Sequence, residues 1–118
     1  MSRPLALVIE DDSDIATIFA MALREADFHA EMIHNGGQAL RRLVEVVPNL
    51  IILDLNLPSV SGVEILRVIR ADSQLADVPV IVATADPRMG ENVREMADLT
   101  LLKPISYEQL RDLVRRFR

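Results

Sequence analysis

The sequence predicts an α/β fold, in which helices cover both faces of a doubly wound, five-stranded parallel sheet. Two observations lead to this fold class. Short apolar runs alternate along the chain with longer segments whose apolar residues recur at helical spacing. The central run, at residues 50–53, reads Leu-Ile-Ile-Leu without alternation, which is typical of a strand buried on both faces of a parallel sheet. Short connections then favour right-handed crossovers between the strands.

A strand, an acidic turn and an amphipathic helix are predicted at the start of the chain. Residues 5–9 form an apolar run that ends in Glu10 and Asp11. Asp12 or Ser13 can cap the following helix, because short polar side chains accept hydrogen bonds from its first free N–H groups. The predicted apolar stripe of this helix is Ile15, Ile18, Phe19, Ala22, Leu23 and Ala26.

The next two elements are a polar strand and a second helix. Residues 29–34 are less apolar than the other predicted strands, which favours a place at the edge of the sheet. A turn at residues 35–37 precedes a helix that we expect to end at Pro48. The predicted apolar stripe of this helix is Leu40, Leu43, Val44 and Val47.

The second half of the chain continues the alternation. After residues 50–53 and a loop through residues 58–62, a third helix is predicted to run from residue 63 to about residue 71. A fourth strand at residues 80–83 is followed by a short helix between residues 88 and 96.

The last strand and the last helix complete the predicted fold. Residues 99–102 form the fifth strand, and Lys103 and Pro104 follow it. Ser106 and Gln109 then match a capping box at the start of the last helix. The predicted buried stripe of this helix is Leu110, Leu113, Val114 and Phe117.

Length and composition limit the possible functions. The 118 residues are expected to form one domain, and the absence of cysteine excludes disulfides, thiolate metal sites and cysteine nucleophiles. No apolar stretch approaches the ~20 residues that span a bilayer, and the first residues lack an export signal, so we expect a cytoplasmic protein without a membrane partner. The net charge of −5 argues against direct nucleic-acid binding.

Two groups of basic side chains have competing interpretations. The arginines at positions 111, 115, 116 and 118 would be the one basic patch for nucleic acid, but a solvated helix face with favourable charge at its C-terminus explains them better. His29 and His34 could suggest a metal site. Their odd spacing in a strand places them on opposite faces, which favours exposed histidines at the sheet edge.

Reactive or charged side chains end four of the five predicted strands: Glu10 with Asp11, Asp54, Thr84 and Lys103. The carboxyl ends of parallel strands meet at one edge of the sheet, where open α/β sheets bind their ligands. A lone aspartate there is well explained as a turn or helix cap. Gathering three acids at one edge, however, lowers stability through repulsion, so the whole set predicts a functional site.

The chemistry of this set points to phosphoryl transfer. Three carboxylates either share a proton or bind a hard divalent cation, and oxygen ligands without cysteine favour Mg²⁺ or Mn²⁺. Lys103 supplies a positive charge and Thr84 a hydroxyl donor, which both suit phosphoryl oxygens. Asp54 could attack phosphorus and become an acyl phosphate.

These residues resemble the motifs of a response-regulator receiver domain of two-component signalling, and the resemblance covers residues 1–118. The matching features are the Glu10-Asp11 pair, Asp54 in Asp-Leu-Asn-Leu-Pro, Gly62 eight residues later, Thr84-Ala85 and Lys103-Pro104. The resemblance implies the flavodoxin-like strand order 2-1-3-4-5.

The resemblance also implies a metal-dependent phosphoacceptor. Asp54 would receive a phosphoryl group from a sensor histidine kinase or a histidine phosphotransfer protein. Asp11 and Asp54 would bind Mg²⁺ directly, Glu10 would bind it through water, and the carbonyl of Asn56 would complete the ligand set.

The remaining implied roles concern the phosphoryl group and the signal. Thr84 and Lys103 would bind the phosphoryl group, and the Lys103–Pro104 peptide bond is expected to be cis. The chain would catalyse only its own phosphorylation and dephosphorylation, and is therefore not an enzyme for an external substrate. A conformational change would carry the signal to a downstream protein or to an output domain outside this sequence.

Two departures from the family pattern leave a second function open. Thr100 stands where the family usually has Tyr, Phe or His, and the 19-residue step from Thr84 to Lys103 is short by about one helical turn, ~3–4 residues. Both changes fall on a face that many receivers use for output. The alternative is therefore a non-phosphorylated interaction module, which Mg²⁺-dependent phosphorylation would distinguish from a receiver. A phosphatase is disfavoured, because no segment indicates a lid over a substrate.

Overall fold

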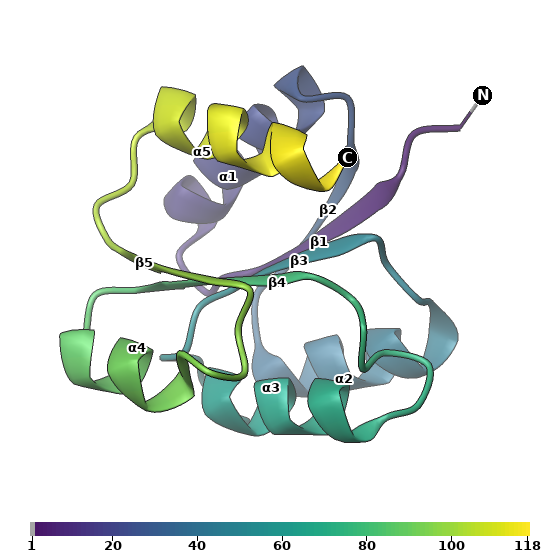
Figure 1. Ribbon diagram of the computed structural model, residues 1–118, viewed down its shortest axis with the longest axis vertical. Helices are drawn as coiled ribbons and strands as arrows, with labels where there is room; N and C mark the ends of the chain where they lie inside the picture. Colours follow the sequence, from purple (N-terminus) through teal and green to yellow (C-terminus); the bar gives the residue numbers. More distant parts are fainter. Residues whose placement is uncertain (1) are drawn as a thin grey trace.

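The computed structural model describes residues 2–118 and contains a five-stranded parallel sheet with helices on both faces (Figure 1). The strands are β1 (Leu5–Ile9), β2 (His29–Ile33), β3 (Leu50–Leu53), β4 (Val80–Thr84) and β5 (Leu99–Leu102). Their order in the sheet is β2-β1-β3-β4-β5, so the predicted fold class and strand order are confirmed. The polar strand β2 lies at an edge, as expected.

The helices form two layers around this sheet. They are α1 (Ser13–Glu25), α2 (Gly36–Glu45), α3 (Gly62–Ala71), α4 (Pro87–Val93) and α5 (Tyr107–Val114), with a short 3₁₀ turn, η1 (Arg115–Phe117), at the end. Helices α1 and α5 cover one face, and α2, α3 and α4 lie on the other (Figure 1). Across residues 2–118, we find no helix with the length and apolarity that crossing a bilayer requires.

The buried strand β3 divides the core into two parts. Ile52 lies beside Val8 of β1 in the sheet and belongs to the core under α1 and α5. The next residue, Leu53, lies beside Ile9 and belongs to the core under α2 and α3. Burying each such side chain is worth about 1.5–3 kcal/mol. The central strands are thus fixed from both faces, and so are the residues at their carboxyl ends.

Helix α2 differs from its prediction. It ends at Glu45 and not at Pro48, and Val44 and Val47 are 88% and 52% exposed. The helix instead begins at Gly36 and buries Gly36, Ala39 and Leu43, which share one face at helical spacing. Val44 lies about 100° around the helix from Leu43 and therefore faces solvent.

Helix α4 is shorter than predicted. It spans Pro87–Val93, whereas residues 88–96 were expected. Asp86 caps its first turn, and beyond Val93 the chain turns towards α3, where the Arg70 guanidinium donates a 2.7 Å hydrogen bond to the Met96 carbonyl. The contact with Arg70 therefore holds Met96 outside the helix, although local spacing assigns this residue to it.

The two predicted helix caps at the ends of the chain are present. Asp12, and not Ser13, caps α1 with its side-chain oxygen. The Ser106 hydroxyl accepts a 3.1 Å hydrogen bond from the Gln109 N–H at the start of α5, which is one of the two bonds of the predicted capping box.

Candidate functional site

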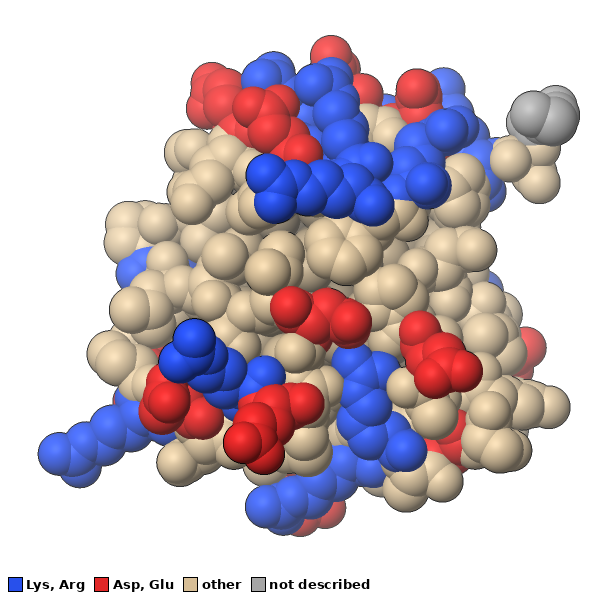
Figure 2. Space-filling view, in the orientation of Figure 1, with Lys and Arg blue, Asp and Glu red and all other residues tan. Residues whose placement is uncertain are grey.

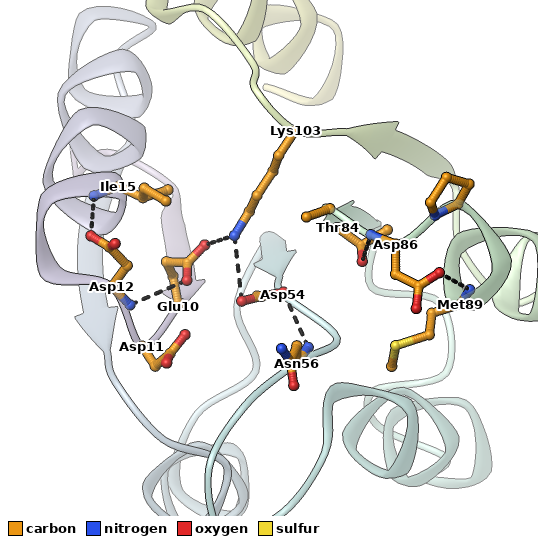
Figure 3. A pocket seen from close by; sticks show the side chains of 12 residues that line it. Glu10, Asp11, Asp12, Ile15, Asp54, Asn56, Thr84, Asp86, Met89 and Lys103 are labelled. Carbon is orange, nitrogen blue, oxygen red and sulfur yellow. Dashed lines mark hydrogen bonds and ion pairs between the residues drawn. The ribbon is translucent and has the colours of Figure 1, made fainter.

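The six residues predicted for the site line one cleft of about 780 Å³ at the carboxyl edge of the sheet (Figure 3). They are Glu10, Asp11, Asp54, Asn56, Thr84 and Lys103. They come from the ends of β1, β3, β4 and β5, which are four strands of one parallel sheet. Parallel pairing alone therefore brings together residues as distant in sequence as Glu10 and Lys103.

The three carboxylates converge at the floor of the cleft. Glu10, Asp11 and Asp54 each offer an oxygen, and these oxygens lie within 4.8 Å of one another. Glu10 and Asp54 are only 2% and 6% exposed, whereas Asp11 faces solvent. The backbone fixes both buried acids, because Asp54 N–H donates to the Ile9 carbonyl and Glu10 N–H to the Ile33 carbonyl, each at 2.9 Å.

Hydrogen bonds to the carboxylates orient the two buried acids. The Asp12 N–H donates to Glu10 Oε2 at 3.2 Å, and the Asn56 N–H donates to Asp54 Oδ1 at 3.1 Å. The other oxygen of each carboxylate faces the Lys103 ammonium, which lies 2.5 Å from Glu10 Oε1 and 3.4 Å from Asp54 Oδ2 (Figure 3). Lys103 thus bridges the two buried acids.

The backbone of Lys103 is also held. Its N–H donates to the Thr84 carbonyl at 2.9 Å, which joins the ends of β4 and β5. The Lys103–Pro104 peptide bond is cis, so that prediction is confirmed.

The electrostatics of the site leave it with excess negative charge. Burial raises the pKa of Glu10 to about 7; its hydrogen bond to Lys103 opposes this rise, and the charge of Asp54 adds to it. For Lys103, burial acts to lower the pKa, but the contacts with Glu10 and Asp54 prevail and raise the pKa of the amine. The cleft thus holds one ammonium and three carboxyl groups, and the ammonium contacts the two buried ones.

This donor set fits a hard divalent cation. Carboxylate oxygens within reach of one point, with water access from the cleft, are the ligands that Mg²⁺ and Mn²⁺ prefer. Asn56 also lines the cleft, and its backbone carbonyl is the further oxygen ligand that the family resemblance implies. His29 and His34 are both exposed, and β2 is an edge strand, which agrees with the interpretation as exposed histidines at the sheet edge.

Thr84 ends β4 on the other side of the cleft. Thr84 is 1% exposed, and its hydroxyl accepts a 3.1 Å hydrogen bond from the Asp86 N–H. Asp86 in turn uses Oδ1 to cap α4, accepting from the N–H groups of Arg88 at 2.9 Å and Met89 at 3.4 Å. The site is thereby connected through Thr84 and Asp86 to the start of α4.

Sequence reasoning missed an apolar pocket next to the site. The sequence pattern places Ile18 in the apolar stripe of α1, yet Ile18 is 43% exposed. This pocket, of about 420 Å³, is lined by Ile15, Ile18, Phe19, Ala85, Lys103, Pro104 and Ile105. One feature of the sequence could have predicted this pocket. The helix α1 begins directly after the acidic turn, so its first apolar residues must lie beside the cleft.

The arginines at the end of the chain form a solvated surface. Basic side chains gather over α5 in the space-filling view (Figure 2), and Arg115, Arg116 and Arg118 are exposed. Asp112 lies among them and pairs with Arg111 at 3.1 Å and with Arg115 at 3.4 Å. This pairing agrees with the interpretation as a solvated helix face.

Comparison with known protein families gives a match over nearly the whole chain. A family model described as the response regulator receiver domain matches residues 6–115. The DNA-binding response regulator MtrA of Mycobacterium tuberculosis (strain ATCC 25618 / H37Rv) is 35% identical over 111 residues, which are 92% of this chain and 47% of that protein. The chain thus spans about half the length of the curated relatives that it matches.

Solved structures give a similar result. A sensor protein from Polaromonas sp. JS666 is 36% identical with a TM-score of 0.85, over 97% of this chain and 94% of that chain. The chemotaxis response regulator CheY4 of Vibrio cholerae has a TM-score of 0.89 over 99% of this chain and 100% of its own. At 24% sequence identity, the second likeness concerns the fold alone.

Proposed function

Because the chain belongs to the response regulator receiver domain family of two-component systems, we propose that Asp54 accepts a phosphoryl group in a Mg²⁺-dependent reaction. The donor is a sensor histidine kinase or a histidine phosphotransfer protein, and residues 1–118 act as one receiver domain. The observation that carries this proposal is the convergence of three carboxylates, a hydroxyl and an ammonium from four strand ends on one cleft.

The proposed reaction is an attack by Asp54 on phosphorus. A P–O bond to the carboxylate forms while the P–N bond to the donor histidine breaks, and the electron pair of that bond stays on the imidazole nitrogen. The Asn56 N–H already donates to Asp54 Oδ1, and this bond orients the carboxylate before the donor arrives. The backbone contact with Ile9 fixes the aspartate further.

Positive charge and hydrogen-bond donors then stabilise the transferred group. Asp11, Asp54, the Asn56 carbonyl and, through water, Glu10 are the residues that would hold Mg²⁺ (or Mn²⁺), which when bound would supply positive charge to the phosphoryl oxygens. Lys103 exchanges part of its contact with Glu10 for a phosphoryl oxygen, and the Thr84 hydroxyl donates to another. Both residues line the same cleft as Asp54.

The same residues support a reaction limited to the chain itself. Water attacks the phosphorus of phosphorylated Asp54, the bond to the carboxylate breaks, and phosphate leaves. The chain acts on no external substrate, and its product is a conformational signal to a downstream protein or to an output domain.

The apolar pocket beside Lys103 supports a protein as the donor. It lies at the edge of the cleft and offers Ile15, Ile18 and Ile105 to a partner surface. A donor that buries these side chains would hold its phosphohistidine near Asp54, whereas a small phosphodonor would gain nothing from them.

Intact mass spectrometry after incubation with acetyl phosphate and Mg²⁺ tests the proposal. We expect the wild type to gain the mass of one phosphoryl group, and Asp54→Asn or wild type with EDTA to gain none. Asp86→Asn, which keeps a side chain able to cap α4, is the folded control and should still be labelled. Full labelling of Asp54→Asn, or labelling that EDTA does not reduce, would contradict the assignment. A wild type that is never labelled would favour the non-phosphorylated interaction module.

A further inference from the structure

The loop between β3 and α3, residues 54–61, lies directly against the start of α2. The Gly36 N–H of α2 donates to the Pro58 carbonyl at 3.3 Å. A Cβ atom at Gly36 would lie 2.0 Å from the Val60 carbonyl oxygen, so only a residue without a side chain fits here. Ser59, between these two contacts, has a positive φ of 74°, which is uncommon for a residue other than glycine.

The same loop is held at its other end by Gly62. The Gly62 N–H donates to the Leu55 carbonyl at 2.9 Å, and a Cβ at this glycine would lie 2.2 Å from the Asp54 carbonyl oxygen. Asn56 belongs to this loop. It lines the cleft, and its N–H donates a hydrogen bond to Asp54 Oδ1. The position of Asn56 is therefore set by contacts at both ends of a short loop.

We propose that Gly36 is a positioning residue for the metal site: its missing side chain lets the loop pack against α2 and so holds the Asn56 carbonyl at the cleft. This inference rests on the proposed function, in which that carbonyl is a metal ligand. Gly36 itself does not line the cleft and acts only through the loop.

The loop, and not α2, would yield if a side chain were added at Gly36. Helix α2 is anchored by buried Ala39 and Leu43 and by the pair between Arg42 and Glu31 at 2.7 Å. The loop is irregular, and its tip is exposed at residues 58 and 59. A methyl group at position 36 would therefore push the loop away and move Asn56 with it.

The neighbouring glycine provides a matched control. A Cβ at Gly37 would meet the Ser59 hydroxyl oxygen at 3.2 Å and Asn35 Oδ1 at 3.5 Å. The Ser59 hydroxyl belongs to a side chain that can rotate, and the distance to Asn35 is an ordinary van der Waals contact, whereas the atom facing Gly36 is a backbone oxygen. Gly37→Ala thus makes the same chemical change in the same helix turn without displacing the loop.

Calorimetric titration with Mg²⁺ alone tests the role of Gly36. We expect Gly36→Ala to raise the dissociation constant about tenfold, as is typical when the support of a metal ligand is lost. Gly37→Ala should stay within about twofold of wild type. Leu43→Ala, which loosens α2 without filling the contact, should lower stability but leave the dissociation constant unchanged.

The outcomes separate this inference from the proposed function. Wild type that binds no Mg²⁺ would overturn the proposed function and this inference with it. Folded Gly36→Ala that binds Mg²⁺ as wild type does would overturn only the role of Gly36. If Gly36→Ala does not fold, the same comparison is made in a Val60→Gly background, where the freer loop can yield. There, Gly36→Ala should again weaken binding about tenfold, and equal affinity would overturn the role.

Discussion

The two sides of the cleft are built differently. On the acidic side, Glu10 and Asp54 are buried, their backbones bond to neighbouring strands, and the loop after β3 is packed between two glycines. On the other side, which we call the α4 side (β4, α4 and β5), the helix has 7 residues and Leu102 is 53% exposed. The Thr100 hydroxyl there is the one side-chain polar atom within residues 2–118 that is buried without a hydrogen-bond partner.

Under the proposed function, this difference would separate the part of the molecule that receives the phosphoryl group from the part that changes conformation. A phosphoacceptor reacts best when its groups are fixed beforehand, and the acidic side has that character. A conformational response requires a region of low local stability, which is typical of short helices, exposed strands and unpaired polar groups. Thr84, at the end of β4, connects the two sides, since it lines the cleft and its Cγ2 packs near Gly90 of α4. We therefore expect the response to occur on the α4 side.

The largest effect is expected on the free energy of unfolding, when a glycine on each side of the cleft is replaced by alanine. At Gly62, a Cβ would overlap the backbone of Asp54 and Leu55 at 2.2 and 2.5 Å. Gly62→Ala should lower the free energy of unfolding by about 3 kcal/mol or more. At Gly90, the nearest atom is Thr100 Cγ2 at 3.0 Å, and the higher helix propensity of alanine offsets the tighter contact. Gly90→Ala should therefore stay within about 1 kcal/mol of wild type. Urea denaturation measures both, and equal losses would mean that the two sides are equally rigid.

The second prediction concerns where the structure responds. Beryllofluoride, a stable mimic of the phosphoryl group, should change amide exchange most between Thr84 and Leu99, because Thr100 has no ring that could reorient on β5. We expect about tenfold changes in α4, equivalent to ~1.4 kcal/mol of local stability. Hydrogen exchange with mass spectrometry on wild type, with Asp54→Asn as the control, locates them. Changes confined to α1 and α2 would place the response on the acidic side.

The third prediction concerns the lifetime of the phosphorylated state. Asn56 and Asp86 flank the cleft, and polar side chains there can orient the attacking water. The phosphorylated state should be short-lived, and Asn56→Lys should slow its loss about fivefold, or ~1 kcal/mol of barrier.

Two variants at Asp86 separate water handling from helix capping. Asp86 caps α4, so Asp86→Ala also removes a cap, while Asp86→Asn keeps the cap and removes the charge. If Asp86 handles water, both variants should dephosphorylate more slowly than wild type. Rates within about twofold of wild type for all three substitutions, under ~0.4 kcal/mol, would mean that these side chains do not handle the water.

The smallest expected effect probes the unpaired hydroxyl directly. Thr100→Val keeps the shape of the side chain and removes the buried oxygen that has no partner among the described residues. It should raise the free energy of unfolding by about 1 kcal/mol. Chemical denaturation measures this change, and Thr17→Val, at an exposed threonine whose hydroxyl bonds the Ser13 carbonyl, should not show the same gain. A loss of stability in Thr100→Val would indicate that the Thr100 hydroxyl hydrogen-bonds to water or to a neighbouring group.

The sequence by itself determined the strand content of the sheet and which residues meet at the site. The apolar runs, the turns between them and the residues that end each strand are local features, and parallel pairing fixes where such endings meet. The sequence alone therefore predicts that Asp54, Thr84 and Lys103 share one cleft, as they do in the structure. The cis peptide bond at Lys103–Pro104 followed from the family resemblance in the same way.

Only the tertiary structure decided how these residues are supported. The Glu10–Lys103 contact joins residues 93 positions apart, and the approach of Gly36 to Val60 depends on how a helix meets a loop. The spacing of apolar residues also does not predict which side of α2 is exposed or that α4 ends at Val93. Both depend on which neighbour each helix packs against. The periodicity of apolar residues shows which side chains can share one face of a helix or strand. The distances between elements depend instead on how the whole fold packs, and local sequence patterns do not reveal them.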